Sequence, residues 1–483
     1  MHFAIIFRIL GVLLMLFSLT HLIPLAVSIL YQDGLHLRFL LSFFFTFIVG
    51  LTIWVPVYKA SADLRTRDGF LITAMFWLVL GIFGSVPFLM DPELNLTLAE
   101  AVFESISGLT TTGATVITGL DDMPKSILFY RQQLQWLGGI GIIVIAIAIL
   151  PMLGIGGMQL YRAETPGPVK DSKMTPRITE TAKWLFFIYT TLTAVCALAY
   201  WLAGMSLFDA ICHSFSTLAI GGFSTHDASM GYFDSPLIYL IASFFMFAAG
   251  INFALHFVAW RKLVFSQYLQ DSETKFYSTM MLSSIIVITA TGYLYGLDDE
   301  LDMFWVHSIF QVVSMATTTG YATTNFSAWP TFLPILLITL SLVGGCAGST
   351  GGGIKVIRVM LIFKQWLREL RHLIHPNAVI PLKLSSKTVP SPILSAVWSF
   401  FGIYMLVFFM LVMLLLATGL DFLTAFSASL AMLNNLGPGL GSVATHYGDV
   451  SESAKWVMCL AMLLGRLEIF TLLVLFTPAF WRR

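Results

Sequence analysis

The chain has 483 residues, of which 57% are hydrophobic and only 11% are charged, and its mean hydropathy is +0.85. A soluble protein cannot cover so much apolar surface, so the composition excludes that class and indicates an integral membrane protein. The 26 basic and 26 acidic residues cancel, which leaves no net basic field for binding nucleic acid. The four cysteines lie in apolar stretches without CxxC spacing, so neither a zinc site nor a disulfide framework is indicated.

Apolar windows of about 20 residues predict ten membrane-spanning helices. These lie near 5–30, 37–58, 69–90, 128–153, 184–204, 236–260, 277–296, 332–372, 393–417 and 454–480. Four shorter apolar segments lie between them, near 98–110, 207–219, 303–317 and 421–434. At about 12 residues each, these segments are too short to cross a bilayer. The first apolar run is longer than the apolar region of a signal peptide, so we expect it to be retained as a helix.

The distribution of basic residues predicts the orientation. With the N-terminus and C-terminus in the cytoplasm, most Lys and Arg residues fall on the inner side, as the positive-inside rule requires. Four basic residues fall outside, namely Arg38, Lys125, Arg131 and Lys455. Arg466 is then the one basic residue inside a predicted span. Most acidic residues fall in outer loops, which are either ordinary solvated loops or a vestibule that attracts cations.

The short segments mark an internal repeat of roughly 110 residues. Each lies between two predicted spans and ends in a glycine-bearing turn, and the turns align on Gly113, Gly222, Gly320 and Gly437. In the fourth copy, the upstream residues that match those of the other three copies are one residue out of register with the aligned glycine. A single such turn is commonly explained by helix packing through small residues. Four turns at one period favour a shared structural role.

The repeats predict an all-α integral membrane fold with four helix–loop–helix units, each holding a re-entrant pore loop. The predicted divisions are 1–68 as a two-helix accessory domain and four pore repeats at 69–181, 182–272, 273–392 and 393–483. Irregular backbone at membrane depth is tolerated only where it is buried in protein or faces water. The four loops therefore predict a common aqueous axis.

Free carbonyl groups along such an axis can replace the hydration shell of an alkali cation. Glycine permits the positive φ that aims successive carbonyls the same way, and threonine hydroxyls add further oxygens. We therefore predict a cation filter built from each aligned glycine and the two residues before it. Its residues are Thr111, Thr112, Gly113, Ile220, Gly221, Gly222, Thr318, Thr319, Gly320, Asn435, Leu436 and Gly437.

Two further features indicate how the passage of cations along this axis is controlled. An ionised side chain inside the membrane is a functional candidate, so Arg466 is expected to act as an electrostatic barrier below the filter, with a structural salt bridge as the alternative. Glu468 lies on a different helix face, so it should pair with another element. Glycine disfavours a helix, so 344–353 should break the eighth span and serve as a gate, or else form a packing kink. The gate residues are Gly344, Gly345, Gly348, Ser349, Thr350, Gly351, Gly352 and Gly353.

With these motifs, the sequence resembles the Trk/Ktr/HKT superfamily of potassium transporters, and most closely the membrane subunit of bacterial Trk uptake systems. The resemblance covers the whole chain and rests on the four turns, on 344–353, on Gly465-Arg466-Leu467-Glu468 and on His375-Pro376-Asn377-Ala378. It implies a single-chain pseudo-tetramer that assembles as a homodimer in the bacterial inner membrane. It also implies a filter that binds potassium, no organic cofactor, a pore-facing Arg466, and a cytosolic regulatory subunit that binds ATP/ADP or NAD(H).

The resemblance predicts potassium uptake driven by the membrane potential. The alternative is a symporter that couples potassium to protons or sodium, for which Glu468 is the candidate titratable residue. A membrane enzyme or scaffold without ion flux is the hypothesis from another class. The sequence has no HExxH motif and no phosphate-binding loop with Gly-Lys-Ser/Thr, so no enzyme is predicted.

Overall fold

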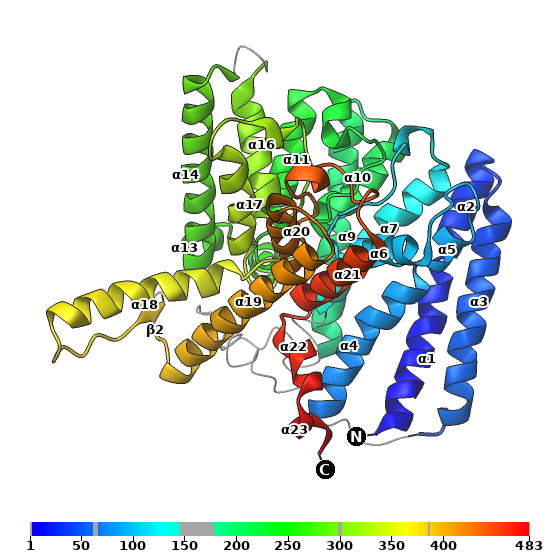
Figure 1. Ribbon diagram of the computed structural model, residues 1–483, viewed down its shortest axis with the longest axis horizontal. Helices are drawn as coiled ribbons and strands as arrows, with labels where there is room; N and C mark the ends of the chain where they lie inside the picture. The colour runs from blue at the N-terminus through cyan, green and yellow to red at the C-terminus, as the bar shows by residue number, and fades with distance from the viewer. Residues whose placement is uncertain (1, 61–65, 145–177, 298–301, 385–386, 483) are drawn as a thin grey trace.

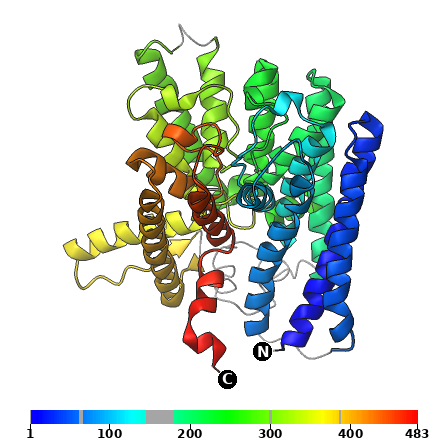
Figure 2. The ribbon, with the colours of Figure 1, turned by 45° about the vertical axis from the view of Figure 1, so that its right-hand side comes forward.

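The computed structural model describes residues 2–60, 66–144, 178–297, 302–384 and 387–482, and they are mostly helical. Long helices stand side by side, and both ends of the described chain lie at one end of the molecule (Figures 1 and 2). One helix, α18 (Val356–Ile374), extends sideways from the bundle. The strands described are β1 (Lys383–Leu384) and β2 (Lys387–Thr388), which pair antiparallel.

Six of the predicted spans are confirmed as helices long and apolar enough to cross a membrane. They are Phe3–Tyr31, His36–Val57, Arg67–Leu89, Ala182–Leu202, Ser272–Leu294 and Ser391–Ala417. The helices within them are α1 (Phe3–Leu19), α2 (Leu22–Tyr31), α3 (His36–Trp54), α4 (Thr66–Phe83), α5 (Val86–Leu89), α9 (Ile178–Leu202), α14 (Ser272–Leu294) and α19 (Ser391–Ala417). Only 17% of the window in His36–Val57 is buried, so most of this apolar helix is free to contact lipid.

Two other predicted spans are bent, and the prediction of one continuous helix is wrong for both. Residues 236–260 form α11 (Pro236–Ala249) and α12 (Phe253–Lys262) with a bend of 94°. The bend occurs where the Asn252 side chain accepts a bond from the backbone N–H of Ala254 and starts a new helix. Residues 454–480 form α21 (Glu452–Arg466) and α22 (Phe470–Leu473) with a bend of 107°.

The remaining two predicted spans have different outcomes. Residues 332–372 form α17 (Leu333–Val343) and α18, and the predicted break at 344–353 between them is confirmed. Helix α7 (Lys125–Val144) begins the span predicted at 128–153, of which 145–153 lie outside the described residues. Short elements complete the helices: α13 (Ser266–Gln270), α23 (Pro478–Trp481), and the 3-10 turns Val55–Val57, Leu120–Asp122, Ser229–Phe233, Phe326–Ala328, Gly441–Val443 and Val474–Phe476.

The four short apolar segments form short helices, as the sequence predicts. They are α6 (Leu98–Leu109), α10 (Leu207–Ala219), α16 (Phe304–Ala316) and α20 (Phe422–Asn434). Thr97, Ser206 and Asp421 cap three of them by accepting a bond from a first-turn backbone N–H. Most residues of these helices are buried, so the helices lie largely inside the molecule rather than on its lipid-facing surface.

The N-terminal helices pack together through glycine. A Cβ atom built on Gly11 of α1 would lie 2.8 Å from the carbonyl oxygen of Gly50 in α3, a close approach typical of membrane helices. The Gln133 side chain of α7 donates to the carbonyl of Thr20 at 2.9 Å. Residues 1–68 therefore contact the predicted first repeat, and the exact repeat boundaries stay a prediction.

Candidate functional site

The four glycine-bearing turns meet in a closed ring. We call residues 111–113, 220–222, 318–320 and 435–437 central loops 1 to 4. A Cβ atom built on each aligned glycine would clash with the carbonyl oxygen of the residue before the next loop's glycine. The distances from the built Cβ atom to the carbonyl oxygen are 2.0 Å from Gly113 to Gly221, 2.0 Å from Gly222 to Thr319, 2.0 Å from Gly320 to Leu436 and 2.7 Å from Gly437 to Thr112. The fourth contact returns to the first loop, so the twelve predicted filter residues lie together around one axis.

All four loops have the same backbone shape. The glycines have φ of 82°, 80°, 85° and 95° in loops 1 to 4, and the residues two positions earlier have φ of 51°, 54°, 67° and 55°. The residue between them has no positive φ in any loop. This alternation turns successive carbonyl groups toward one side, as a filter of backbone oxygens requires.

The sequence analysis predicts positive φ at the glycines but misses it two residues earlier. Thr111, Ile220 and Thr318 are β-branched, and such residues rarely adopt a left-handed conformation. Each costs roughly 1–3 kcal/mol and persists only where the surroundings impose it. The central loops are therefore held by the rest of the fold rather than by local preference.

Each loop is tied to its own short helix by the same backbone bond. The N–H of the residue before the glycine donates to the carbonyl six residues before that glycine. These distances are Thr112 to Ser107 2.9 Å, Gly221 to Ser216 2.9 Å, Thr319 to Ser314 2.8 Å and Leu436 to Ala431 2.8 Å. The fourth copy keeps this register although its upstream sequence is shifted. In loops 1 and 3 a serine hydroxyl adds a bond to the carbonyl after the glycine, from Ser107 to Ala114 at 2.6 Å and from Ser314 to Tyr321 at 2.7 Å.

One side of the ring opens into a cavity of about 620 Å³, lined by all four aligned glycines and by residues that follow them. At its wall, His226 Nδ1 lies 2.5 Å from Asp121 Oδ1, and His226 Nε2 lies 3.4 Å from Asp209 Oδ1. Burial opposes protonation of His226, but the two carboxylates outweigh it and raise the pKa of the imidazole. The same contacts lower the pKa of Asp121 against the effect of its own burial. This cluster joins the connections that follow loops 1 and 2.

The other side of the ring is covered by residues 344–353. The N–H of Gly352 donates to the Thr318 hydroxyl at 2.7 Å, and the Thr350 hydroxyl donates to the Leu218 carbonyl at 3.1 Å. A Cβ atom on Gly352 would lie 1.9 Å from the carbonyl oxygen of Asn434. The predicted gate residues therefore contact loop 3 and the C-terminal ends of α10 and α20.

Arg466 bridges the ring and this segment. Its Nη2 atom donates to the Thr111 hydroxyl at 2.5 Å and to the Thr350 carbonyl at 3.2 Å, and its Nε has no partner in the described residues. None of the ion pairs found within the described ranges includes Arg466, so a salt bridge does not account for its position there. Glu468 pairs instead with Arg358 of α18 at 2.7 Å, which confirms the expectation that it contacts another element.

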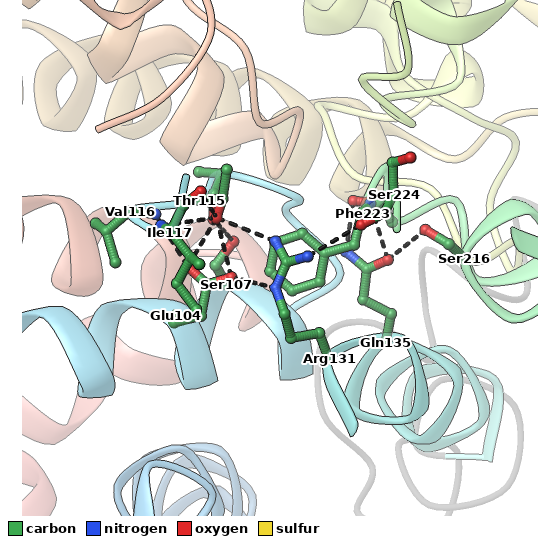
Figure 3. Close-up of polar contacts among 12 residues, drawn as sticks. Glu104, Ser107, Thr115, Val116, Ile117, Arg131, Gln135, Ser216, Phe223 and Ser224 are labelled. Carbon is green, nitrogen blue, oxygen red and sulfur yellow. Dashed lines mark hydrogen bonds and ion pairs between the residues drawn. The ribbon is translucent and has the colours of Figure 1, made fainter. Parts of the chain in front are cut away.

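Sequence reasoning missed two buried ion pairs, one of which supports the ring from α7. It assigned Arg131 and Lys455 to the outer side, which stays a prediction, and it expected no buried partner for either side chain. The Arg131 side chain is 1% exposed and pairs with Glu104 of α6 at 2.8 Å (Figure 3). Lys455 is 3% exposed and pairs with Glu100 at 2.8 Å. The polar run Arg131-Gln132-Gln133 beside an otherwise apolar stretch was the signal that could have revealed the buried site.

Gln135 of α7 contacts loop 2 directly. Its Nε2 donates to the Gly221 carbonyl at 2.7 Å, and its Oε1 accepts from the N–H of Phe223 at 3.1 Å (Figure 3). The Ser216 hydroxyl donates to the same Oε1 atom. Helix α7, which belongs to the predicted first repeat, thus braces a loop of the second.

A family model described as "Cation transport protein", TrkH, matches residues 35–483. The chain belongs to the TrkH family. It is 56% identical to the Trk system potassium uptake protein TrkH of Halomonas elongata over 100% of both chains. It is 41% identical to the Trk system potassium uptake protein TrkG of Escherichia coli, with 100% of this chain and 99% of that protein covered.

A solved structure has the same fold. The chain matches the crystal structure of the potassium transporter TrkH from Vibrio parahaemolyticus with a TM-score of 0.92 and 51% identity, over 100% of both chains. The predicted resemblance is therefore confirmed, and so is the coarser prediction of a helical, multi-pass membrane protein of a cation transport family.

Proposed function

We propose that this chain takes up potassium through the axis of the four central loops. The observation that carries the proposal is the closed ring of glycine-to-carbonyl contacts, which brings four loops of one backbone shape around one axis. Carbonyl oxygens in such a ring can replace the water around a dehydrated alkali cation. Relatives that align over the full chain are named potassium uptake proteins, which supports potassium as the cation.

The membrane potential supplies the driving force in this proposal. Moving one elementary charge through 100 mV is worth about 2.3 kcal/mol. An inside-negative potential of that size supports roughly fifty-fold accumulation of a monovalent cation. No chemical step in this chain is then required for uptake.

Residues 344–353 and Arg466 form the gate in this proposal. The segment covers the ring on the side away from the cavity and donates bonds to Thr318 and Leu218. A cation leaving the ring must pass the half-buried Arg466, a fixed positive charge in a setting of low dielectric constant. Displacing the segment and this charge together would open the path.

The assembly follows from the family resemblance. We propose a homodimer in the bacterial inner membrane, with both termini in the cytoplasm, and a cytosolic nucleotide-binding subunit of the Trk type on the inner face. The basic residues of α18 support an attachment site there, because the helix follows the gate directly and Arg371 and His372 are exposed. A partner that moves α18 would pull on the segment at 344–353.

The proton-coupled symporter is the weaker alternative. Its candidate carboxylate, Glu468, pairs with Arg358 at 2.7 Å. A carboxylate already engaged in an ion pair is a poor candidate for a free proton carrier. A reversal potential that follows pH rather than potassium would nevertheless favour the symporter.

The test is potassium flux in proteoliposomes that contain this chain alone, with the potential set by an ionophore. The proposal predicts potassium uptake that follows the imposed potential without added nucleotide, and a smaller flux of sodium. Empty liposomes and liposomes held at zero potential are the controls. Folded protein that shows no potential-driven uptake would overturn the proposal.

A further inference from the structure

We propose that the buried pair Glu104–Arg131 is a positioning device that fixes central loops 1 and 2 and thereby sets the selectivity of the ring. This inference rests on the proposed function, because it assigns a role within the cation pathway. Neither residue belongs to a central loop. Both act on the chain that leaves loops 1 and 2 toward the cavity.

The contacts of the two side chains join the loops. Glu104 accepts from Arg131 Nε at 2.8 Å and from the N–H of Val116 at 3.0 Å. The Thr115 hydroxyl lies 3.1 Å from both Glu104 carboxylate oxygens and accepts from Arg131 Nη2 at 3.0 Å. Arg131 Nη1 donates to the carbonyl of Ser224 at 3.0 Å. Thr115 and Ser224 each lie two residues after an aligned glycine, so one guanidinium spans equivalent positions of neighbouring loops (Figure 3).

Burial makes this arrangement rigid. The side chains are 1% and 0% exposed, and the Arg131 guanidinium also lies over the Phe223 ring, 4.3 Å from its centroid. A buried ion pair adds little net stability compared with apolar packing, because desolvation offsets the attraction. Its planar, directional bonds do fix geometry. A pair in this position is therefore better explained by positioning than by stability.

The other loops lack an equivalent charge. The residue nine positions before the aligned glycine is Glu104 in repeat 1, His213 in repeat 2, Gln311 in repeat 3 and Ala428 in repeat 4. His213 Nε2 lies 2.9 Å from the Ser224 hydroxyl oxygen, and Gln311 Nε2 donates to the Thr324 carbonyl at 3.4 Å. Alanine at the fourth position has no polar side chain to offer.

The same side-chain position thus braces the four loops with decreasing strength, from an ion pair to none. Among the residues that the structure describes, no side chain of an ion pair bonds to Ala322 or Gly439, which follow loops 3 and 4 at the positions equivalent to Thr115 and Ser224. Loops 1 and 2 form the firmly held half of the ring, and loops 3 and 4 form the half that is held by neutral bonds. Selectivity between cations of different size requires that at least part of the ring keep its width.

The test compares reversal potentials under potassium and sodium gradients for purified, folded variants. Arg131→Lys keeps the charge but loses the planar guanidinium group that bonds to the residues after both loops. Glu104→Gln removes the negative charge of the carboxylate. Each should lower the potassium-to-sodium permeability ratio by roughly tenfold. The double variant Glu104→Gln/Arg131→Met should lose no more than either single variant, because the two side chains act as a unit.

The matched control is the pair Lys455–Glu100, which is also separated by 2.8 Å and has a nearly buried lysine. Lys455 also donates to the carbonyl of Gly448 and contacts no central loop in the described structure. Lys455→Met should therefore lower thermal stability without changing the permeability ratio. If the charge variants do not fold, Thr115→Val removes the shared hydroxyl without leaving a charge unpaired, and it should lower the ratio several-fold.

The outcomes separate this inference from the proposed function. Wild-type protein without potassium preference would contradict the proposed function itself. A selective wild type whose folded Arg131→Lys, Glu104→Gln and Thr115→Val variants keep the wild-type ratio would overturn the positioning role alone. An equal loss of selectivity in Lys455→Met would also overturn it, because any buried ion pair would then have the same effect.

Discussion

The four central loops and residues 344–353 are both irregular backbone at the centre of the molecule, and the two regions are held in different ways. Each central loop is bonded to the short helix that precedes it, through one N–H bond common to all four repeats. Residues 344–353 are bonded largely to other elements, since Cys346 donates to the Gly250 carbonyl and Ala347 to the Glu273 carboxylate. A segment held mainly by other elements can be released when they move, whereas each central loop also has a backbone bond to its own short helix in addition to its tertiary contacts. This difference suits the ring to selection and the segment to gating.

The largest change in selectivity should come from adding a side chain at a glycine of the ring. Gly320→Ser places a Cβ atom 2.0 Å from the Leu436 carbonyl at a φ of 85°, and the strain of 1–3 kcal/mol or more should reduce the potassium-to-sodium permeability ratio by roughly tenfold. Bi-ionic reversal potentials measure the ratio. Gly402→Ala is the control, because nothing lies within 4 Å of its Cβ position. An unchanged permeability ratio in folded Gly320→Ser would show that the ring does not determine cation selectivity.

Shortening the segment should leave selection intact and raise flux. Deleting residues 349–352 removes the Thr350 and Gly352 bonds to Leu218 and Thr318, so we expect potassium flux about five-fold higher and less dependent on the regulatory subunit. Proteoliposome flux with and without that subunit measures both. A deletion variant that folds and keeps wild-type flux and regulation would rule out the gate.

A smaller increase is expected from Arg466→Ala. The guanidinium contacts both the Thr111 hydroxyl and the Thr350 carbonyl, so its removal takes away a positive charge and one bond that joins ring and segment. Flux should rise about three-fold as the electrostatic barrier falls. Arg466→Lys keeps the charge and serves as the control. Unchanged flux with lower thermal stability in Arg466→Ala would make this residue a structural support.

The smallest effect concerns pH at the cavity wall. Because its pKa is raised, His226 contributes stability that is fully present below its unfolded value of 6.5 and is lost as pH rises through its folded value. His213 does not titrate in this range, because burial lowers its pKa to about 4. The melting temperature should fall by about 1–2 °C between pH 6 and pH 9 through this group. His226→Gln should remove that part of the slope; an identical slope in the variant would exclude His226 as its source.

The ring was predictable from sequence because its signal is repeated. Four glycines at a common period, each after a segment too short to span, predict four loops around one axis, and the contacts among Gly113, Gly222, Gly320 and Gly437 agree with that arrangement. The break at 344–353 was predictable for a similar reason, since repeated glycine disfavours a helix. A residue pattern that is repeated along the chain, or clustered in one stretch, can be recognised in a single sequence.

The supporting residues were not predictable in the same way. Arg131 and Glu104 occur once, and hydropathy windows assign an arginine near a helix end to the nearest loop. The left-handed conformation of Thr111 and Ile220 is imposed by tertiary contacts and has no local signal. The bends after α11 and α21 contain no proline, so apolar composition alone predicted continuous helices. Tertiary context decided each of these features.

The central claim is that the four loops together form one potassium-binding ring. The most direct measurement is the melting temperature of the purified chain against potassium or sodium concentration, because a ligand that binds only the folded state stabilises it. The account predicts saturable stabilisation by potassium, weaker stabilisation by sodium, and a weakened potassium effect in each of Gly113→Ser, Gly222→Ser, Gly320→Ser and Gly437→Ser, with Gly402→Ala unchanged. Equal stabilisation by both cations, or a potassium effect as large as that of the wild type after substitution of any one of the four glycines, would contradict it.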